Sequence, residues 1–107
     1  PYLSDIGAEW VVPERERLNL IYADALEELA FLFLDTNQLE RCLAICQVAL
    51  KRDRFYEAIY QIEMRAYAAL GDRSAVARRY RACRMAMQDL GIPLSEETEL
   101  IYRELSV

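Results

Sequence analysis

The chain has 107 residues, 54% of them hydrophobic, with three glycines, three prolines and a net charge of −5. This length suits one domain, and the scarcity of glycine and proline favours a few long helices over many strands. The absence of histidine excludes Ser-His and Cys-His nucleophile pairs and histidine metal sites, and the negative charge argues against a surface that wraps nucleic acid.

The first helix is predicted to begin at Pro13 and to run to about Leu34. Proline suits the first position of a helix, because its missing N–H has no intrahelical partner there. Apolar residues then recur at three- and four-residue spacing, as on one face of a helix. Residues 1–12 lack such a period, and we expect an ordered lead-in segment there.

Residues 29–34 are apolar on every side of this helix, so every side needs cover. One interpretation is that neighbouring helices and residues 1–12 bury the whole segment. The other is that part of the segment meets a missing upstream helix or a second chain. The second interpretation makes Phe31, Leu32 and Leu34 candidates for an interaction surface.

Four further helices are predicted after a break at residues 35–37. Their expected ranges are 38–52, 56–70, 73–90 and a short terminal helix that starts near Pro93 and Ser95. Asn37 and Glu40 resemble a capping box for the second helix, and Asp72 caps the fourth. A glycine ends the third helix and another ends the fourth. Long helices joined by short loops pack as antiparallel neighbours.

A shift of 34 residues aligns the second helix with the fourth. The aligned pairs are Asn37 with Gly71, Leu43 with Ala77, Cys46 with Tyr80, and Ala49 with Cys83. Each pair falls at a turn or on the inward stripe, and this helix–turn–helix period is that of tetratricopeptide repeats. The sequence therefore predicts an all-α fold over residues 1–107, with about five helices in tetratricopeptide-like antiparallel hairpins that form a short right-handed array.

Three stretches in register carry a resemblance to a known family. They are EWVVPERERL at 9–18, LGDR at 70–73 with YRACR at 80–84, and LGIPLSEET at 90–98 followed by Tyr102. Their order and spacing resemble the bacterial transcriptional activator domain of SARP-type regulators over nearly the whole chain. The resemblance implies a tetratricopeptide-like domain that usually follows a winged-helix DNA-binding domain and supports dimerisation and contacts with other domains.

Two departures from the family pattern bear on the whole protein. No winged-helix segment is present, and in the family helical sequence normally precedes the part that begins here. We therefore expect the chain to be a fragment of a longer regulator. It has no secretory signal, no apolar run long enough for a membrane span and an odd number of cysteines, and these features predict a cytoplasmic location.

The predicted fourth helix is rich in arginine. Its arginines are Arg73, Arg78, Arg79, Arg81 and Arg84. All but Arg79 share one helical face. This face can be solvated, with its arginines bridged to acidic neighbours, or it can dock an acidic protein surface. It can also bind phosphate, although no glycine-rich cradle accompanies the arginines. Arg79 points into the apolar half of the helix, where its guanidinium needs a carboxylate partner or an interface.

The cysteines and two tyrosines also allow two interpretations. Cys42, Cys46 and Cys83 are expected to be small buried packing residues, with a redox role as the alternative. A metal site would need further soft ligands that the chain does not offer. Tyr60 and Tyr67 share one face of the third helix, where they either pack in the core or line a ligand site.

Together these features predict no catalytic residue, no metal and no cofactor. The preferred hypothesis is a protein–protein interaction, dimerisation and signal-relay module of a bacterial transcription regulator, which acts with a DNA-binding domain outside this chain. Its partners would be a second copy, in a homodimer, or other domains of the regulator, with no direct nucleic-acid or membrane binding. The alternative is a sensor that binds an anionic nucleotide through the basic face of the fourth helix.

Overall fold

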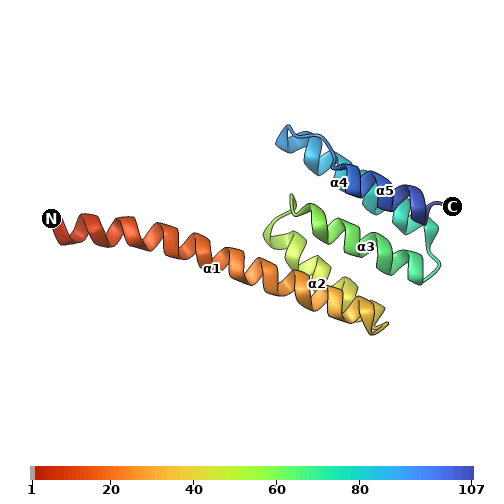
Figure 1. Ribbon diagram of the computed structural model, residues 1–107, viewed down its shortest axis with the longest axis horizontal. Coiled ribbons are helices and arrows are strands. Elements are labelled where there is room, and N and C mark those ends of the chain that lie inside the picture. Colours follow the sequence, from red (N-terminus) through yellow and green to blue (C-terminus); the bar gives the residue numbers. More distant parts are fainter. Residues whose placement is uncertain (1) are drawn as a thin grey trace.

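The computed structural model describes the backbone of residues 2–107 and the side chains of residues 14–107. Its helices are α1 (Tyr2–Asp35), α2 (Leu39–Arg52), α3 (Glu57–Ala69), α4 (Arg73–Leu90) and α5 (Glu96–Leu105). α1 and α2 form one antiparallel hairpin, α3 and α4 form a second, and α5 packs against α3 and α4 (Figure 1). The described part of the chain has no strand, so the predicted all-α fold of helical hairpins is confirmed.

The same backbone turn ends α1, α3 and α4. Asn37, Gly71 and Gly91 all have positive φ, of 60°, 78° and 81°. In each turn the next N–H donates to a carbonyl five residues back, for example from Gln38 to Phe33 at 2.8 Å. These are Schellman turns, which glycine adopts without strain and asparagine tolerates better than most residues. The shared turn explains why the 34-residue shift aligns Asn37 with Gly71.

The role predicted for Asn37 is wrong, because this residue closes α1 and does not cap α2. The cap position of α2 is Gln38, and its side chain makes no capping hydrogen bond. The other predicted cap is confirmed, since Asp72 accepts a hydrogen bond from the Ala75 N–H. Ser95 stands at the equivalent position of α5 and accepts from the Thr98 N–H.

α1 begins eleven residues earlier than predicted and passes through Pro13. A proline inside a helix removes one hydrogen bond and costs about 3 kcal/mol, but it does not prevent the residues before it from being helical. The lead-in therefore continues along the helix axis. It does not fold back over residues 29–34, and this half of α1 extends beyond the rest of the molecule (Figure 1).

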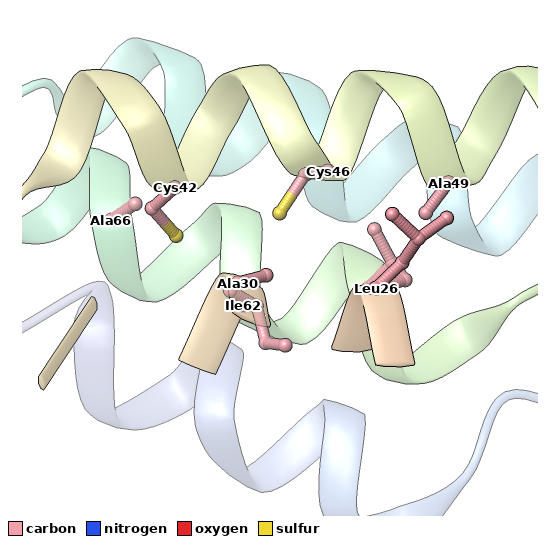
Figure 2. Packing of buried hydrophobic residues seen from close by; sticks show 8 residues of the cluster. Leu26, Ala30, Cys42, Cys46, Ala49, Ile62 and Ala66 are labelled. Carbon is pink, nitrogen blue, oxygen red and sulfur yellow. The ribbon is translucent and has the colours of Figure 1, made fainter. Parts of the chain in front are cut away.

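Small side chains lie where α1, α2 and α3 meet. Figure 2 shows Cys42, Cys46 and Ala49 of α2 facing Leu26 and Ala30 of α1, and all five are buried. Small residues allow neighbouring helices to approach closely, which is how repeated hairpins nest. A second cluster around Cys83 joins α3 to α4.

Candidate interaction surfaces

Only one of the two apolar faces of α1 is covered by other helices. Its inward residues, such as Leu26 and Ala30, are buried against α2 and α3. A second row of apolar residues on another side of the helix is exposed to solvent. This row, the outer stripe, consists of Leu18, Ile21, Ala25, Leu29 and Leu32, spaced three or four residues apart.

The segment 29–34 is not buried on every side, because its outward side is exposed to solvent. Leu34 packs against the core, but Leu29, Phe31 and Leu32 are exposed, Leu32 to 57%. The interpretation that neighbouring helices and the lead-in bury the whole segment is therefore wrong. α1 stands at one end of the array, so no described helix reaches this side (Figure 1).

The outer stripe is symmetric about Ala25. Ile21 and Leu29 lie four residues before and after Ala25, and Leu18 and Leu32 lie seven residues before and after it. An antiparallel copy of this helix would present the same pattern of side chains in return. Such self-complementarity is what a two-fold interface requires.

A groove of about 620 Å³ lies between α1 and the turn that joins α2 to α3. Leu20 and Leu26 line it, and Arg52 lies at its edge. The Arg52 guanidinium donates to Asn19 Oδ1 at 3.1 Å, and its Cζ lies 4.3 Å from the centre of the Tyr22 ring. The groove therefore provides a partly apolar surface beside α1, where contacts with Asn19 and Tyr22 hold the Arg52 side chain in place.

The arginines of α4 divide into three kinds. Arg78, Arg81 and Arg84 are exposed, and among the described side chains none of them has a hydrogen bond or an ion pair. We call these three residues the arginine face. Arg73 is also exposed, but its Nη2 donates to the Val107 carbonyl at 2.7 Å. The structure thus leaves three guanidinium groups of α4 available to a partner.

Arg79 is the inward arginine, and the prediction that it needs a carboxylate is confirmed. Its Nε donates to Glu63 Oε1 at 2.8 Å, and its Cζ lies 5.4 Å from the centre of the Tyr60 ring. Burial raises the pKa of the Glu63 carboxyl, and the Arg79 charge offsets only part of this effect. Because Arg79 has its partner within the chain, it does not require an interface.

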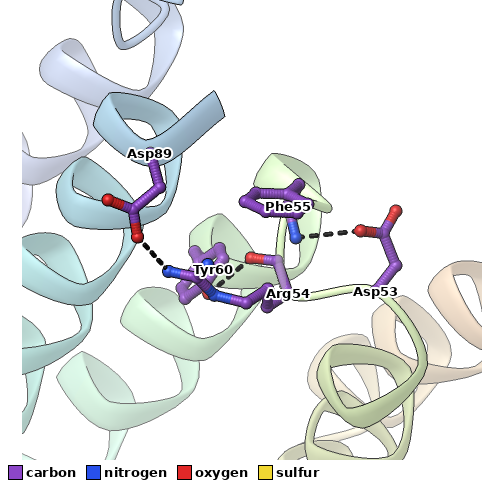
Figure 3. A network of polar contacts seen from close by, with 5 residues as sticks. All are labelled: Asp53, Arg54, Phe55, Tyr60 and Asp89. Atoms are coloured by element: carbon purple, nitrogen blue, oxygen red, sulfur yellow. Dashed lines mark hydrogen bonds and ion pairs between the residues drawn. The ribbon is translucent and has the colours of Figure 1, made fainter. Parts of the chain in front are cut away.

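Tyr60 and Tyr67 lie inside the second hairpin. Tyr60 is 4% exposed and packs beside Cys83, while Tyr67 packs against the cluster that contains Met64. The Tyr60 hydroxyl donates to the Arg54 carbonyl at 2.7 Å (Figure 3). These contacts place Tyr60 in the packing between helices, whereas Tyr67 is half-buried and also lines a hollow with Glu63 and Arg79.

The turn between α2 and α3 is tied to α4 by a polar contact that the sequence did not reveal. The link is one ion pair, in which Arg54 Nη2 donates to Asp89 Oδ2 at 2.7 Å, whereas the Phe55 N–H donates to Asp53 Oδ1 at 2.9 Å within the turn itself (Figure 3). Arg54 and Asp89 are 35 residues apart in the chain. A separation of this length leaves no local signal in a sequence.

A second missed contact fixes the start of α5. The Glu57 carboxylate accepts hydrogen bonds from the Ser95 N–H at 3.0 Å, from Ser95 Oγ at 2.7 Å and from the Thr98 hydroxyl. Burial acts to raise the pKa of Glu57, but these hydrogen bonds outweigh it and hold the pKa below its ordinary value. This carboxylate therefore joins α3 to the cap of α5.

The cysteines are buried and unbridged, as the packing interpretation expects. Cys42, Cys46 and Cys83 are each fully buried. Burial raises the pKa of the Cys83 thiol to about 12, so it stays protonated at neutral pH. Among the residues whose side chains are described, no group of three or more acidic or cysteine side chains could hold a metal ion.

Comparison with known proteins adds one clear result. No curated protein and no solved structure matches the chain. None of the described helices is long and apolar enough to cross a membrane. The family model for the bacterial transcriptional activator domain matches residues 1–106. The chain, with its two helical hairpins and closing helix, therefore belongs to the bacterial transcriptional activator domain family.

Proposed function

We propose that this domain is a protein–protein interaction, dimerisation and signal-relay module, and that it acts with a DNA-binding domain outside this chain. Its family places it among the domains of transcription regulators. The observation that supports the interaction role is the outer stripe of α1. Exposed apolar residues in a continuous row mark surfaces that partners cover.

The partner proposed for the outer stripe is a second copy of the chain. In an antiparallel pair centred on Ala25, Leu18 faces Leu32 of the second copy and Ile21 faces Leu29. Every such contact is apolar, and the small side chain at the centre lets the two helices approach closely. The result is a two-fold homodimer in which burial of apolar area supplies the main favourable free energy.

Charged residues beside the outer stripe make both favourable and unfavourable contacts in this pairing. On one flank Arg17 comes near Asp35 of the second copy, which is favourable. On the same flank Asp24 comes near Glu28 of the second copy, which is unfavourable. Because these electrostatic contributions oppose each other, the stability of the dimer depends mainly on apolar contact and changes little with salt concentration.

The relay role rests on the continuity of α1. This helix carries the outer stripe and also extends from Tyr2 to Asp35 without a break. Pro13 removes one backbone hydrogen bond, but after it the unbroken hydrogen bonds of the helix resist bending, so this part transmits the orientation of one end to the other. Pairing through the stripe would therefore set the direction in which the paired helices leave the domain.

Sedimentation at micromolar concentration tests the homodimer. The parent chain is expected to sediment as a dimer and the Leu32→Glu variant as a monomer, because the substitution places two carboxylates against apolar side chains in each pair. The dimer should persist at high salt. A parent chain that stays monomeric would contradict the proposal.

Leu100→Glu is the matched control for this experiment. Leu100 is 51% exposed on α5, close to the 57% of Leu32, so the substitution makes the same chemical change on a different helix. The control should keep both the helical circular dichroism and the dimer of the parent. If Leu100→Glu also separates the subunits, α1 is not the interface.

A further inference from the structure

The arginine face of α4 carries like charges without compensation. Arg78, Arg81 and Arg84 follow one another at three-residue spacing, and neighbouring like charges on a helix cost a few tenths of a kcal/mol per pair. Two arginines elsewhere are paired with carboxylates, Arg54 with Asp89 and Arg79 with Glu63, whereas Arg65 on α3 has no pair among the described side chains. What distinguishes α4 is that three unpaired guanidinium groups adjoin on one face of the helix.

Exposed apolar side chains lie on both sides of the arginine face, on one side within a hollow of mixed polarity. Met85, on the same side of α4 as Arg78 and Arg81, is 61% exposed. On the other side a hollow of about 320 Å³ is lined by Arg84, Ile92 and Leu94, together with other residues of α4, α5 and their loop. A partner that supplied only negative charge would leave this apolar surface uncovered.

Carboxylates of α5 begin beyond one end of the arginine face, where Arg84 and Glu99 line the same hollow. Glu96 and Glu97 are exposed at the start of α5, and Glu99 lines the hollow while it accepts a hydrogen bond from the Tyr80 hydroxyl. A long polyanion such as duplex DNA would run from the arginines onto these carboxylates. A short anionic segment can contact the arginines and stop before it reaches them.

We infer that the arginine face binds a short acidic protein segment with an apolar side chain beside its carboxylates. The carboxylates contact Arg78, Arg81 and Arg84, where guanidinium groups offer paired donors. The apolar side chain enters the hollow beside Ile92. α1 and α4 share no contact among the described helices, so this site is independent of the proposed homodimer and adds a second partner.

Fluorescence anisotropy with a synthetic probe tests this site. The probe is a labelled peptide of about three helical turns, with glutamates on one face and one leucine beside them. The complete chain is expected to bind it, and Arg78→Glu/Arg81→Glu should weaken binding by about tenfold or more. Arg65→Glu, which changes an exposed arginine on α3, should leave the affinity unchanged.

Variants of the probe separate charge from apolar contact. Replacing its glutamates with glutamine should abolish binding, and replacing its leucine with serine, or Ile92 with serine in the chain, should weaken binding several-fold. Equal binding by the α4 and α3 variants would overturn the inference, as would tighter binding of duplex DNA, inorganic phosphate or ATP. Sedimentation of Arg78→Glu/Arg81→Glu should match the parent, and altered self-association would mean that the arginine face binds a second copy.

Discussion

In the Glu63–Arg79 pair, the arginine determines the free-energy penalty of burying the carboxylate. The Glu63 side chain is 5% exposed and that of Arg79 is 30% exposed. Removing water from a carboxylate is unfavourable, and only the hydrogen bond and charge of the arginine offset this penalty. The two residues lie on α3 and α4, so the pair also fixes the packing of the second hairpin.

Arg79→Ala is expected to lower the free energy of unfolding by roughly 3 kcal/mol near neutral pH, because it leaves the Glu63 carboxylate buried without a partner. The loss should shrink as the pH is lowered from neutral toward the ordinary pKa of a glutamate, about 4.3. A carboxyl whose pKa is raised in the folded state binds its proton there before the unfolded chain does, so falling pH favours the folded variant. Urea unfolding of parent and variant at neutral pH and near that pKa measures this difference.

The control for that experiment is the double variant Arg79→Ala/Glu63→Gln. A neutral amide at position 63 should recover part of the stability at neutral pH and remove the pH dependence that Arg79→Ala introduces. If Arg79→Ala unfolds at the parent's urea concentration, the ion pair does not stabilise the hairpin.

At the scale of the helix, α5 depends on one carboxylate of α3. Glu57→Ala is expected to speed amide hydrogen exchange in α5 by about tenfold, since it removes three hydrogen bonds at the start of this helix. Exchange in α1 and α2 should not change. Mass spectrometry of the exchanged peptides makes the measurement, and Glu97→Ala, an exposed neighbour, is the control.

The pH dependence of this contact follows from the lowered pKa of Glu57. A carboxyl with a depressed folded pKa contributes its full stability above the unfolded value, about 4.3. It loses that contribution as the pH falls through the folded pKa. α5 should therefore loosen in acid before the first hairpin does, and simultaneous loss of protection in all helices would argue against a separate contact.

Local signals were sufficient to place α2, α3 and α4, whose predicted bounds agree with the structure to within one residue. Caps and positive-φ turns involve residues adjacent in sequence, so the sequence shows them directly. Pro13 misled because a proline inside a helix is unfavourable but does not always end it, and Asn37 misled because asparagine also suits the left-handed position after a helix. The symmetry of the outer stripe could be read from its spacing, but only the structure shows which side of α1 other helices cover.

At the scale of the whole molecule, the candidate surfaces lie at opposite ends. The domain measures 61 × 32 × 18 Å, with α1 at one side of the hairpin array and α4 with α5 at the other (Figure 1). A partner on the outer stripe therefore leaves the arginine face accessible. This separation is consistent with the proposed interaction module, because two contacts can form at once.

The isolated chain is not expected to bind duplex DNA with sequence specificity. Its net charge is −5, and Glu99 of α5 lines the same hollow as Arg84 of the arginine face. A gel shift at physiological salt, with random-sequence DNA as competitor, checks this expectation. Sequence-dependent binding below micromolar concentration would contradict it and would place DNA recognition within this domain.

The symmetry of the outer stripe has a consequence for cells that hold both normal and altered chains. In a mixed pair, a change at Leu32 disturbs only one of the two contacts between Leu18 and Leu32, and the other contact is kept. A change at Ala25 is different, because in the proposed homodimer this residue meets its own counterpart at the two-fold axis. Substitutions away from the axis should therefore weaken a mixed pair less than a pair of two altered chains. A substitution at Ala25 changes the central contact of every pair that contains it.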